Sequence, residues 1–423
     1  EGSWCVTALV GFDLMCAYEY SDGLLQEPDR ELIIQVVHPL ALYVMRNRET
    51  HAYIANHIAT GIAFLERWGH AVNERTALSE AESLLSGLIE SLDSEGWFPE
   101  YGGADPGYQT LTMYYLADCL ARKRSAEVED IVGKSLKFLS HFVHPDGSLG
   151  GTYGSRNTRF YYPSGIAELA PQFPTAAAIH KFMSTSVDRK AVVGLDSMDK
   201  GNIGPMFNSY CRAAVMHHQL RDLDSSEVLP HQEDAAIPLQ FPSAGIVVDG
   251  GPNHYTIVSV SKGGVVYHFQ EDHLTYQDDG VAVLLGKGQW ATTQYLEAGQ
   301  ELQESGQNHL VVTKRLALIA GRKPSVVSFI ALRILSLTAF RSERMRKWIK
   351  ARIVRSLNAQ ERKQALTNVR TIQFGFDLVV SDTLRKQAGI QVLPSGRSFS
   401  ALHMASQGYW EFKDETSLPR GDS

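Results

Sequence analysis

Cysteine is scarce in this 423-residue sequence, which has four cysteines and no C-x-x-C pair. The four are Cys5, Cys16, Cys119 and Cys211, and their scattered positions provide neither a disulfide framework nor a compact cysteine-based metal motif. Isolated cysteines of this kind are typical of reduced core residues. They favour a reducing compartment.

Long apolar runs and an excess of positive charge are also missing. No apolar stretch reaches the length of a transmembrane helix, and the formal net charge of −7 provides no basic field for nucleic acid. No signal peptide is recognisable, because the first residues already have the pattern of a helix interior. We expect a cytoplasmic protein, or a periplasmic one if a signal segment precedes these residues.

A helical half is followed by a strand-rich half. From residue 1 to about 235, apolar residues recur at i, i+3 and i+4, as in NHIATGIAFLERWG and YQTLTMYYLADCLARK. Two glycine-rich loops, 93–109 and 144–163, resemble each other at a spacing of about fifty residues. Helical hairpins repeated in this way predict a bundle or a closed α/α ring whose long loops share one face.

Short β-branched runs bounded by glycine begin at about residue 240. Examples are AGIVVDGG, YTIVSVSKGG, VVYHFQ and PSVVSFIALRIL, and such runs predict an antiparallel β-sandwich. The predicted fold class is therefore α+β and multidomain. We predict a helical domain over residues 1–236, as an α/α toroid that is complete or incomplete, and a β-sandwich over residues 237–423.

A basic segment interrupts the strand pattern, with a predicted helical insertion at about 338–368. Residues 341–356 contain seven basic residues and one acidic residue, and Met345, Ile349, Ile353 and Leu357 recur at helical spacing beside Trp348. Three interpretations stay open for residues 341–357. The helix packs on the sandwich, lies on an anionic membrane surface as a peripheral contact, or receives an acidic polysaccharide.

The loop EGWFPEYGGADPGYQ, residues 95–109, is too long and too aromatic for an ordinary connection between helices. It ends on Tyr108, which lies at the boundary of the next helix, where binding residues concentrate. Asn56 and His57 begin another helical pattern, where asparagine is also a common N-cap. Both a structural and a functional interpretation are open for these residues.

The loop GSRNTRFYYP concentrates side chains suited to acidic sugars. Arginine offers a planar fork to carboxylates, and aromatic rings offer flat faces to sugar rings. The candidate substrate-binding residues are Arg156, Asn157, Arg159, Tyr161 and Tyr162. The alternative is a loop held by its own hydrogen bonds.

Histidines and aspartates of the strand-rich half could bind a metal ion. His273, Asp279 and His309 are the candidate ligands, because imidazole combined with carboxylate suits zinc. Their spacing matches no compact zinc motif. A structural zinc ion is therefore an option that the sequence leaves open, and no cofactor is expected to be required for catalysis.

These stretches together resemble the heparinase II/III-like polysaccharide lyases, including the related alginate and oligoalginate lyases. The resemblance rests on the Asn56-His57 pair, on the loop from Glu95 to Tyr108, and on His268 in GGVVYHFQEDH. SGQNHLVVTKRL and IQFGFDLVVSDTL are similar to later strands of the family. The resemblance covers most of residues 50–390 and implies an α/α toroid followed by an antiparallel β-sandwich, with the active site between them.

Three features depart from the family pattern. The family often carries an H-x-H-x-D run in the first strands, whereas this sequence reads HLTYQDDG at the matching place. The helical half is short for a full toroid, and the basic insertion is unexpected. The first departure puts a metal site or part of the active site in doubt.

The resemblance implies β-elimination from a uronic-acid-containing polysaccharide. Tyr108 would protonate the leaving oxygen and could also accept the C5 proton, with His57 or Tyr295 as the alternative base. Asn56 and His268, assisted by Arg156, would bind the substrate carboxylate. Sugar rings would stack on Trp97, Phe98 and Tyr101.

Two other functions are compatible with the same residues. A glycoside hydrolase needs two carboxylates across one bond, and Asp93, Glu95, Glu100 and Asp105 are available in the loop. A non-catalytic accessory protein that binds a polysaccharide or assists its biosynthesis would retain the fold with a degraded site.

Overall fold

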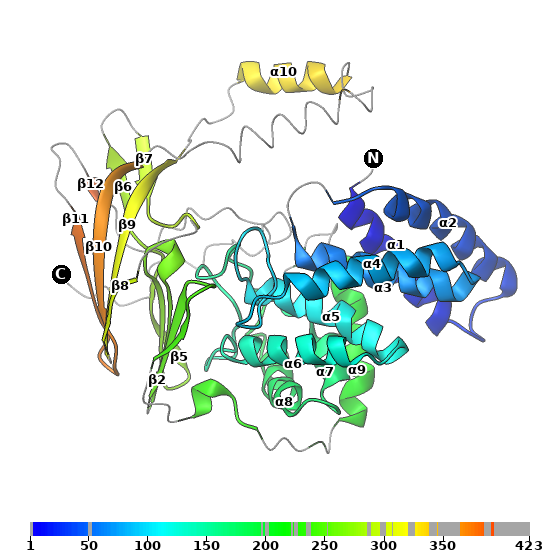
Figure 1. Ribbon diagram of the computed structural model, residues 1–423, viewed down its shortest axis with the longest axis horizontal. Coiled ribbons are helices and arrows are strands. Elements are labelled where there is room, and N and C mark those ends of the chain that lie inside the picture. Colours follow the sequence, from blue (N-terminus) through cyan, green and yellow to red (C-terminus); the bar gives the residue numbers. More distant parts are fainter. Residues whose placement is uncertain are drawn as a thin grey trace. The chain divides into compact units, whose positions relative to one another are not determined.

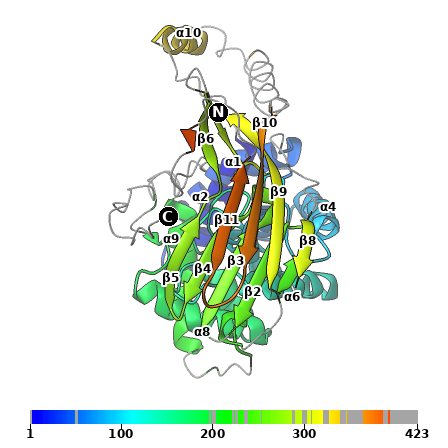
Figure 2. The same ribbon diagram turned by 90° about the vertical axis from the view of Figure 1, so that its left-hand side faces the viewer.

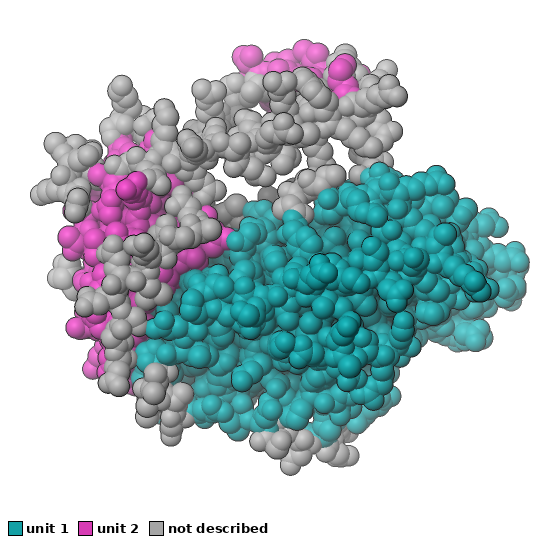
Figure 3. Space-filling model, in the orientation of Figure 1, with its two compact units in different colours: residues 1–259, 267–277, 400–423 teal, residues 260–266, 278–399 magenta. Residues whose placement is uncertain are grey.

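The computed structural model describes most of the chain. It covers residues 3–49, 53–195, 198, 203–220, 223, 227–233, 238–251, 253–285, 289–296, 302–306, 308–319, 326–337, 345, 364–384 and 391–392. The described residues belong to two compact units (Figure 3). Unit 1 takes those of 1–259 and 267–277, and unit 2 takes those of 260–266 and 278–399.

Unit 1 begins with helices that follow one another along the chain (Figure 1). They are α1 (Trp4–Tyr20), α2 (Glu27–Arg46), α3 (Ala55–Val72), α4 (Arg75–Ser91), α5 (Pro106–Arg122), α6 (Ala126–Ser140), α7 (Pro163–Leu169), α8 (Pro174–Asp188) and α9 (Ile203–Gln219). Helix α3 packs on α1, α4 and α5, and α7 packs on α5, α8 and α9. Among the described residues, no helix combines the length and the apolar character needed to cross a membrane.

Helix α5 occupies the centre of this packing. It begins where Pro106 supplies the first helical position and the Asp105 side chain accepts a hydrogen bond from the backbone N–H of Tyr108. Every residue from Pro106 to Leu120 is buried, so the helix contacts protein on all faces rather than along one stripe. The glycine-rich loop before α5 is therefore held against the core.

Strands follow the helices after α9, and the first of them begins at Leu239. Five strands form the first sheet in sequence order (Figure 2): β1 (Leu239–Phe241), β2 (Ile246–Gly251), β3 (His254–Ser259), β4 (Val265–Gln270) and β5 (His273–Asp278). The registers of β1–β2 and β2–β3 are antiparallel. Most of this sheet belongs to unit 1.

Unit 2 contains a second sheet in the order β11-β10-β9-β7-β6-β12, with β8 paired to β9. Its strands are β6 (Ala282–Leu285), β7 (Gln289–Thr292), β8 (Leu302–Gly306), β9 (His309–Ile319), β10 (Gln364–Gln373), β11 (Val379–Leu384) and β12 (Gln391–Val392). Neighbours pair antiparallel, as predicted. The buried Arg370 guanidinium bonds to Asp278, Asp382 and the Gly264 carbonyl, which joins three segments of this unit.

One predicted strand is a helix. The run PSVVSFIALRIL contributes to α10 (Val326–Leu337), in which Val326, Ile330 and Ile334 recur four residues apart. A run of twelve residues is long for a strand and fits a helix. The prediction of a strand was wrong because it relied on the β-branched composition alone. The basic segment 341–357 lies outside the described residues except for Met345, and residues 364–368, predicted as insertion, belong to strand β10.

The described secondary structure is thus mixed α+β, with helices followed by two antiparallel sheets. The toroid and the predicted boundary at residue 236 stay predictions.

Candidate functional site

The two glycine-rich loops that resemble each other in sequence lie against one another in unit 1. The Ser155 hydroxyl bonds to the Glu100 carbonyl at 2.5 Å, and the Ser155 N–H donates to Ala104 at 2.9 Å. The Arg156 N–H donates to the Asp105 carboxylate at 2.8 Å. A Cβ on Gly107 would meet Thr158 atoms at 2.5 to 2.8 Å, so glycine permits this close approach.

Asn56 is not the N-cap that its sequence position allowed. Helix α3 starts at Ala55 after Ile54, and Asn56 instead binds the buried carboxylate of Glu100. The backbone N–H of Asn56 reaches Glu100 Oε1 at 2.8 Å, and its side-chain amide reaches Oε2 at 2.6 Å. Burial raises the pKa of Glu100 well above its usual value, while the bonds from Asn56 oppose that rise.

His57 and Tyr101 extend this group toward Arg156. The His57 Nδ1 atom lies 2.9 Å from a Glu49 carboxylate oxygen, and the His57 ring meets the Tyr101 ring edge to face at 6.4 Å. The Arg156 guanidinium lies over the Tyr101 ring, 3.9 Å from its centre. Tyr101 has a φ of 56°, a left-handed conformation that is uncommon for an aromatic residue.

Tyr108 lies in the first turn of α5 and completes the group. Its buried ring contacts Tyr101 at 5.6 Å and Phe160 at 5.3 Å between ring centres. Burial raises the Tyr108 pKa well above its usual value, as do Tyr101 and Asp105, whereas Arg156 lowers it. The pKa of Tyr101 rises to about 12, chiefly through burial. Both hydroxyls therefore keep their protons at neutral pH.

These contacts define the tyrosine cluster, a name used below for six residues. They are Asn56, His57, Glu100, Tyr101, Tyr108 and Arg156. Sequence reasoning singled out five of them for substrate chemistry and considered Glu100 only as a hydrolase carboxylate. Its partner Asn56 is 44 positions away, and no sequence spacing indicates such a bond.

The rest of the loop 156–162 is mostly turned into the protein. The Arg159 guanidinium donates to the Tyr267 hydroxyl at 2.8 Å, and Asn157 is buried with a left-handed φ of 59°. Tyr161 and Tyr162 are buried within the helical core. Packing in the core therefore explains why Tyr161 and Tyr162 are aromatic. A role for them in substrate binding stays a prediction.

Within unit 1, Trp97 bonds to the turn between strands β1 and β2. Its indole N–H lies 3.1 Å from the Ser243 hydroxyl and 3.3 Å from Glu95. The Glu95 carboxylate accepts the backbone N–H groups of Ser243 and Ala244 at 2.8 and 3.0 Å. Phe98, beside Trp97, is completely buried in the core.

The His268 side chain lies on the opposite face of strand β4 from Tyr267 and Phe269. Its strand neighbours Tyr267 and Phe269 both contact the His144 ring, and successive side chains of a strand point to opposite faces. The His268 ring instead lies 2.8 Å from the Thr256 hydroxyl and 6.1 Å, centre to centre, from His254. Its predicted convergence with Tyr108 stays a prediction.

The sequence did not indicate a buried chain of hydrogen bonds that is centred on His144. His144 Nδ1 lies 2.7 Å from the Ser148 hydroxyl, and Nε2 lies 2.7 Å from the Tyr153 hydroxyl. Burial lowers the His144 pKa to about 3, which keeps the ring neutral. Tyr153 contacts the Tyr267 ring edge to face at 5.2 Å. The H-P-D-G-S turn around His144 was read only as a loop repeat.

The remaining predicted site residues lie in or near the strands. The backbone carbonyl of Tyr295, in unit 2, accepts a bond from Lys314. Within the described part of the chain, no three His, Cys, Asp or Glu side chains are grouped so that they could hold a metal ion. His273, Asp279 and His309 therefore form no such group there, and a structural zinc ion stays a prediction.

Comparison with known proteins gives only distant likeness. No family model and no curated protein matches the sequence. A heparinase III with methylated lysines is 12% identical, with a TM-score of 0.48, over 90% of this chain and 54% of its own. Another heparinase III is 10% identical, with a TM-score of 0.42, over 83% and 50%. A Paenibacillus xanthan lyase is 10% identical, with a TM-score of 0.43, over 73% and 36%.

This chain thus spans between 36% and 54% of the length of those three structures. Likeness at this level does not assign the chain to a family or to a reaction.

Proposed function

We propose that the chain is a polysaccharide lyase that cleaves a uronic-acid-containing polysaccharide by β-elimination. One observation carries the proposal: the tyrosine cluster brings a buried tyrosine, a histidine, an amide and an arginine together from three separate segments. These are the groups that elimination next to a carboxylate requires. No metal is needed for the steps below.

The reaction breaks the C5–H and C4–O bonds and forms a C4=C5 double bond. The C5 proton becomes acidic only when the neighbouring carboxylate is bound by hydrogen-bond donors or a cation. The Arg156 guanidinium and the second N–H of the Asn56 amide are suited to that task. Glu100 holds the Asn56 amide by its other N–H, which fixes its direction.

Proton transfer is divided between two residues. Tyr108 keeps its proton because burial raises its pKa, so it is suited to protonate the leaving oxygen. The Glu49 carboxylate beside Nδ1 of His57 favours the tautomer with the proton on Nδ1. The Nε2 atom then carries a lone pair and is suited to accept the C5 proton.

The hydrolase alternative is less well supported by the loop carboxylates. Glu95 accepts two backbone N–H groups, and Asp93 accepts the Ser243 hydroxyl at 2.6 Å. Asp105 caps helix α5 and also binds the Arg156 N–H. A pair of glycosidase carboxylates must instead flank one bond of the sugar.

The test is an ultraviolet absorbance screen against uronic-acid polysaccharides, because the elimination product contains a conjugated double bond. We expect absorbance to rise with at least one polymer. Tyr108→Phe should lower kcat by at least about a hundredfold with little change in substrate affinity, since it removes a proton and keeps the ring. Tyr115→Phe, which changes another buried tyrosine of helix α5 outside the tyrosine cluster, is the matched control and should remain active.

Other outcomes would contradict the proposal. New reducing ends without absorbance would indicate a hydrolase. Binding of a polymer without turnover would indicate a non-catalytic accessory protein. Equal activity of the Tyr108→Phe protein would remove Tyr108 from the mechanism.

A further inference from the structure

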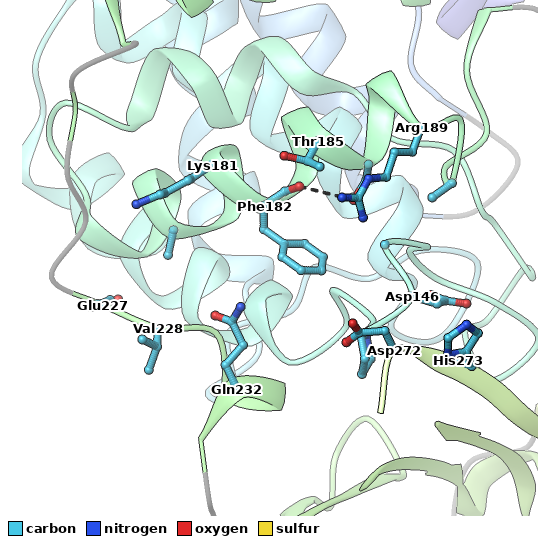
Figure 4. A pocket seen from close by; sticks show the side chains of 15 residues that line it. Asp146, Lys181, Phe182, Thr185, Arg189, Glu227, Val228, Gln232, Asp272 and His273 are labelled. Atoms are coloured by element: carbon cyan, nitrogen blue, oxygen red, sulfur yellow. Dashed lines mark hydrogen bonds between the residues drawn. The ribbon is translucent and has the colours of Figure 1, made fainter. Parts of the chain in front are cut away.

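A cavity of about 650 Å³ lies in unit 1, apart from the tyrosine cluster (Figure 4). Helix α8 forms one wall through Lys181, Phe182 and Arg189, and Asp146 and Asp272 come from two turns opposite it. Its volume is in the range of sites that take small organic ligands. The proposed reaction does not account for it, and His273, named above as a candidate zinc ligand, is among its lining residues.

Phe182 provides an apolar face between polar groups. In Figure 4 its ring projects between Arg189 on one side and Gln232 on the other. The ring is half-buried, and the edge-to-face contact with His231, at 4.9 Å between centres, orients it. An oriented aromatic face bordered by hydrogen-bonding side chains suits a ligand with one apolar face and a polar rim.

The charges of the cavity argue against a simple anion site. Two cations, Lys181 and Arg189, are accompanied by three carboxylates, Asp146, Glu227 and Asp272, so positive charge is not in excess. Figure 4 shows Asp146 and Asp272 on the side of Arg189, and Glu227 on the side of Lys181. Arg189 and Asp272 therefore place a donor and an acceptor at the same end, which suits hydroxyl groups because a hydroxyl both donates and accepts.

We propose that this cavity is a second carbohydrate-binding site that takes one or two sugar rings. One ring would place its C–H face on Phe182, and neighbouring hydroxyls would bond to Arg189 and Asp272. This role does not depend on the elimination reaction. The turn that carries Asp146 is fixed by its bonds to the Ser148 hydroxyl and N–H, at 2.6 and 2.9 Å, so one polar wall is preformed.

Binding is measured by isothermal titration of the full chain carrying Tyr108→Phe, which separates it from turnover. The probes are cellotriose, a neutral trisaccharide, and tri-galacturonate, an acidic one, with inorganic phosphate as the anion probe. We expect millimolar or tighter binding of at least one trisaccharide. Arg189→Ala and Asp272→Asn should each weaken it about tenfold or more, because each removes a hydrogen bond to a charged group.

Matched controls are Arg75→Ala and Asp29→Asn, which remove exposed charges of the same kind outside the cavity. They should leave the affinity unchanged. The proposal is overturned if neither trisaccharide binds, if the cavity variants bind as well as the controls, or if phosphate binds as tightly and is lost in the same variants. Ultraviolet product formation by the chain with Tyr108 intact is scored separately, so failure of one proposal does not imply failure of the other.

Discussion

Glu100 is the residue whose environment most directly predicts a measurable property. Its side chain is inaccessible to solvent and its pKa in the folded state is raised well above 4.5, with burial as the largest cause. Between pH 4.5 and that raised value, the folded state binds more protons at this site than the unfolded state. Stability from this residue is therefore fully present below about pH 4.5 and is lost as pH rises through the folded pKa.

We expect Glu100→Gln to remove this contribution. The wild-type free energy of unfolding should fall relative to that of the variant by up to about 1.4 kcal/mol per pH unit within the window. Urea denaturation at a series of pH values from 4.5 upward measures the difference. Glu90→Gln changes an exposed carboxylate and should follow the wild type. Parallel curves for wild type and Glu100→Gln would contradict the raised pKa.

Residue-level chemistry was only partly accessible from sequence. Tyr108 and Arg156 stood out because each follows a glycine-rich stretch, where binding residues concentrate. The sequence did not show that Glu100 binds Asn56, because the two residues are far apart along the chain. It did not show that His144 bonds to two hydroxyls either, because burial decides that contact. Tyr161 and Tyr162 were singled out as aromatic rings for sugar stacking, and the structure adds that both are packed in the core, which no sequence pattern indicates.

Helices α5 and α7 approach closely because Gly165 has no side chain. A Cβ there would lie 2.5 Å from the Tyr114 backbone nitrogen and 2.6 Å from its Cα, and backbone atoms cannot rotate away. We expect Gly165→Ala to force the helices apart and to destabilise unit 1 by about 1–3 kcal/mol. Thermal or urea unfolding measures the change.

Gly87 is the matched control for that substitution. It lies inside helix α4, and an added Cβ would meet no described atom within 4 Å. Gly87→Ala should therefore stabilise the protein by about 0.5–1 kcal/mol, because alanine favours the helix and loses less backbone freedom. Destabilisation by both substitutions would show that the helix-to-helix contact is not the cause.

Element type was predictable wherever periodicity and length agreed. The helices up to α9 repeat apolar residues at three and four positions, and strands such as β2, β4 and β6 are short with glycine at or beside one end. Helix α10 was missed because its valines and isoleucines match strand composition. Length was the better guide there, since twelve residues exceed most strands.

At the scale of the whole helical assembly, a buried ion network joins helices that are distant in sequence. The Asp118 carboxylate of α5 accepts two hydrogen bonds from the Arg67 guanidinium of α3, at 2.5 and 3.0 Å. It also forms an ion pair with the Arg212 guanidinium of α9, at 2.9 Å. Arg212 also binds Glu168 of α7 at 2.7 and 2.8 Å. No sequence pattern links these four residues, so periodicity predicts the helices without predicting how they are joined.

We expect Asp118→Asn to destabilise unit 1 by about 3–5 kcal/mol, because two buried guanidinium groups lose their shared counter-charge. Arg67 and Asp118 expose only 1% and 2% of their side chains, so water cannot replace the lost carboxylate. Asp130→Asn is the matched control, since Asp130 pairs with Lys134 at the surface and should cost no more than about 0.5 kcal/mol. Urea denaturation near neutral pH measures both. An Asp118→Asn protein as stable as the control would mean that Glu19 and Glu168, which also bind Arg67 and Arg212, supply enough counter-charge without Asp118.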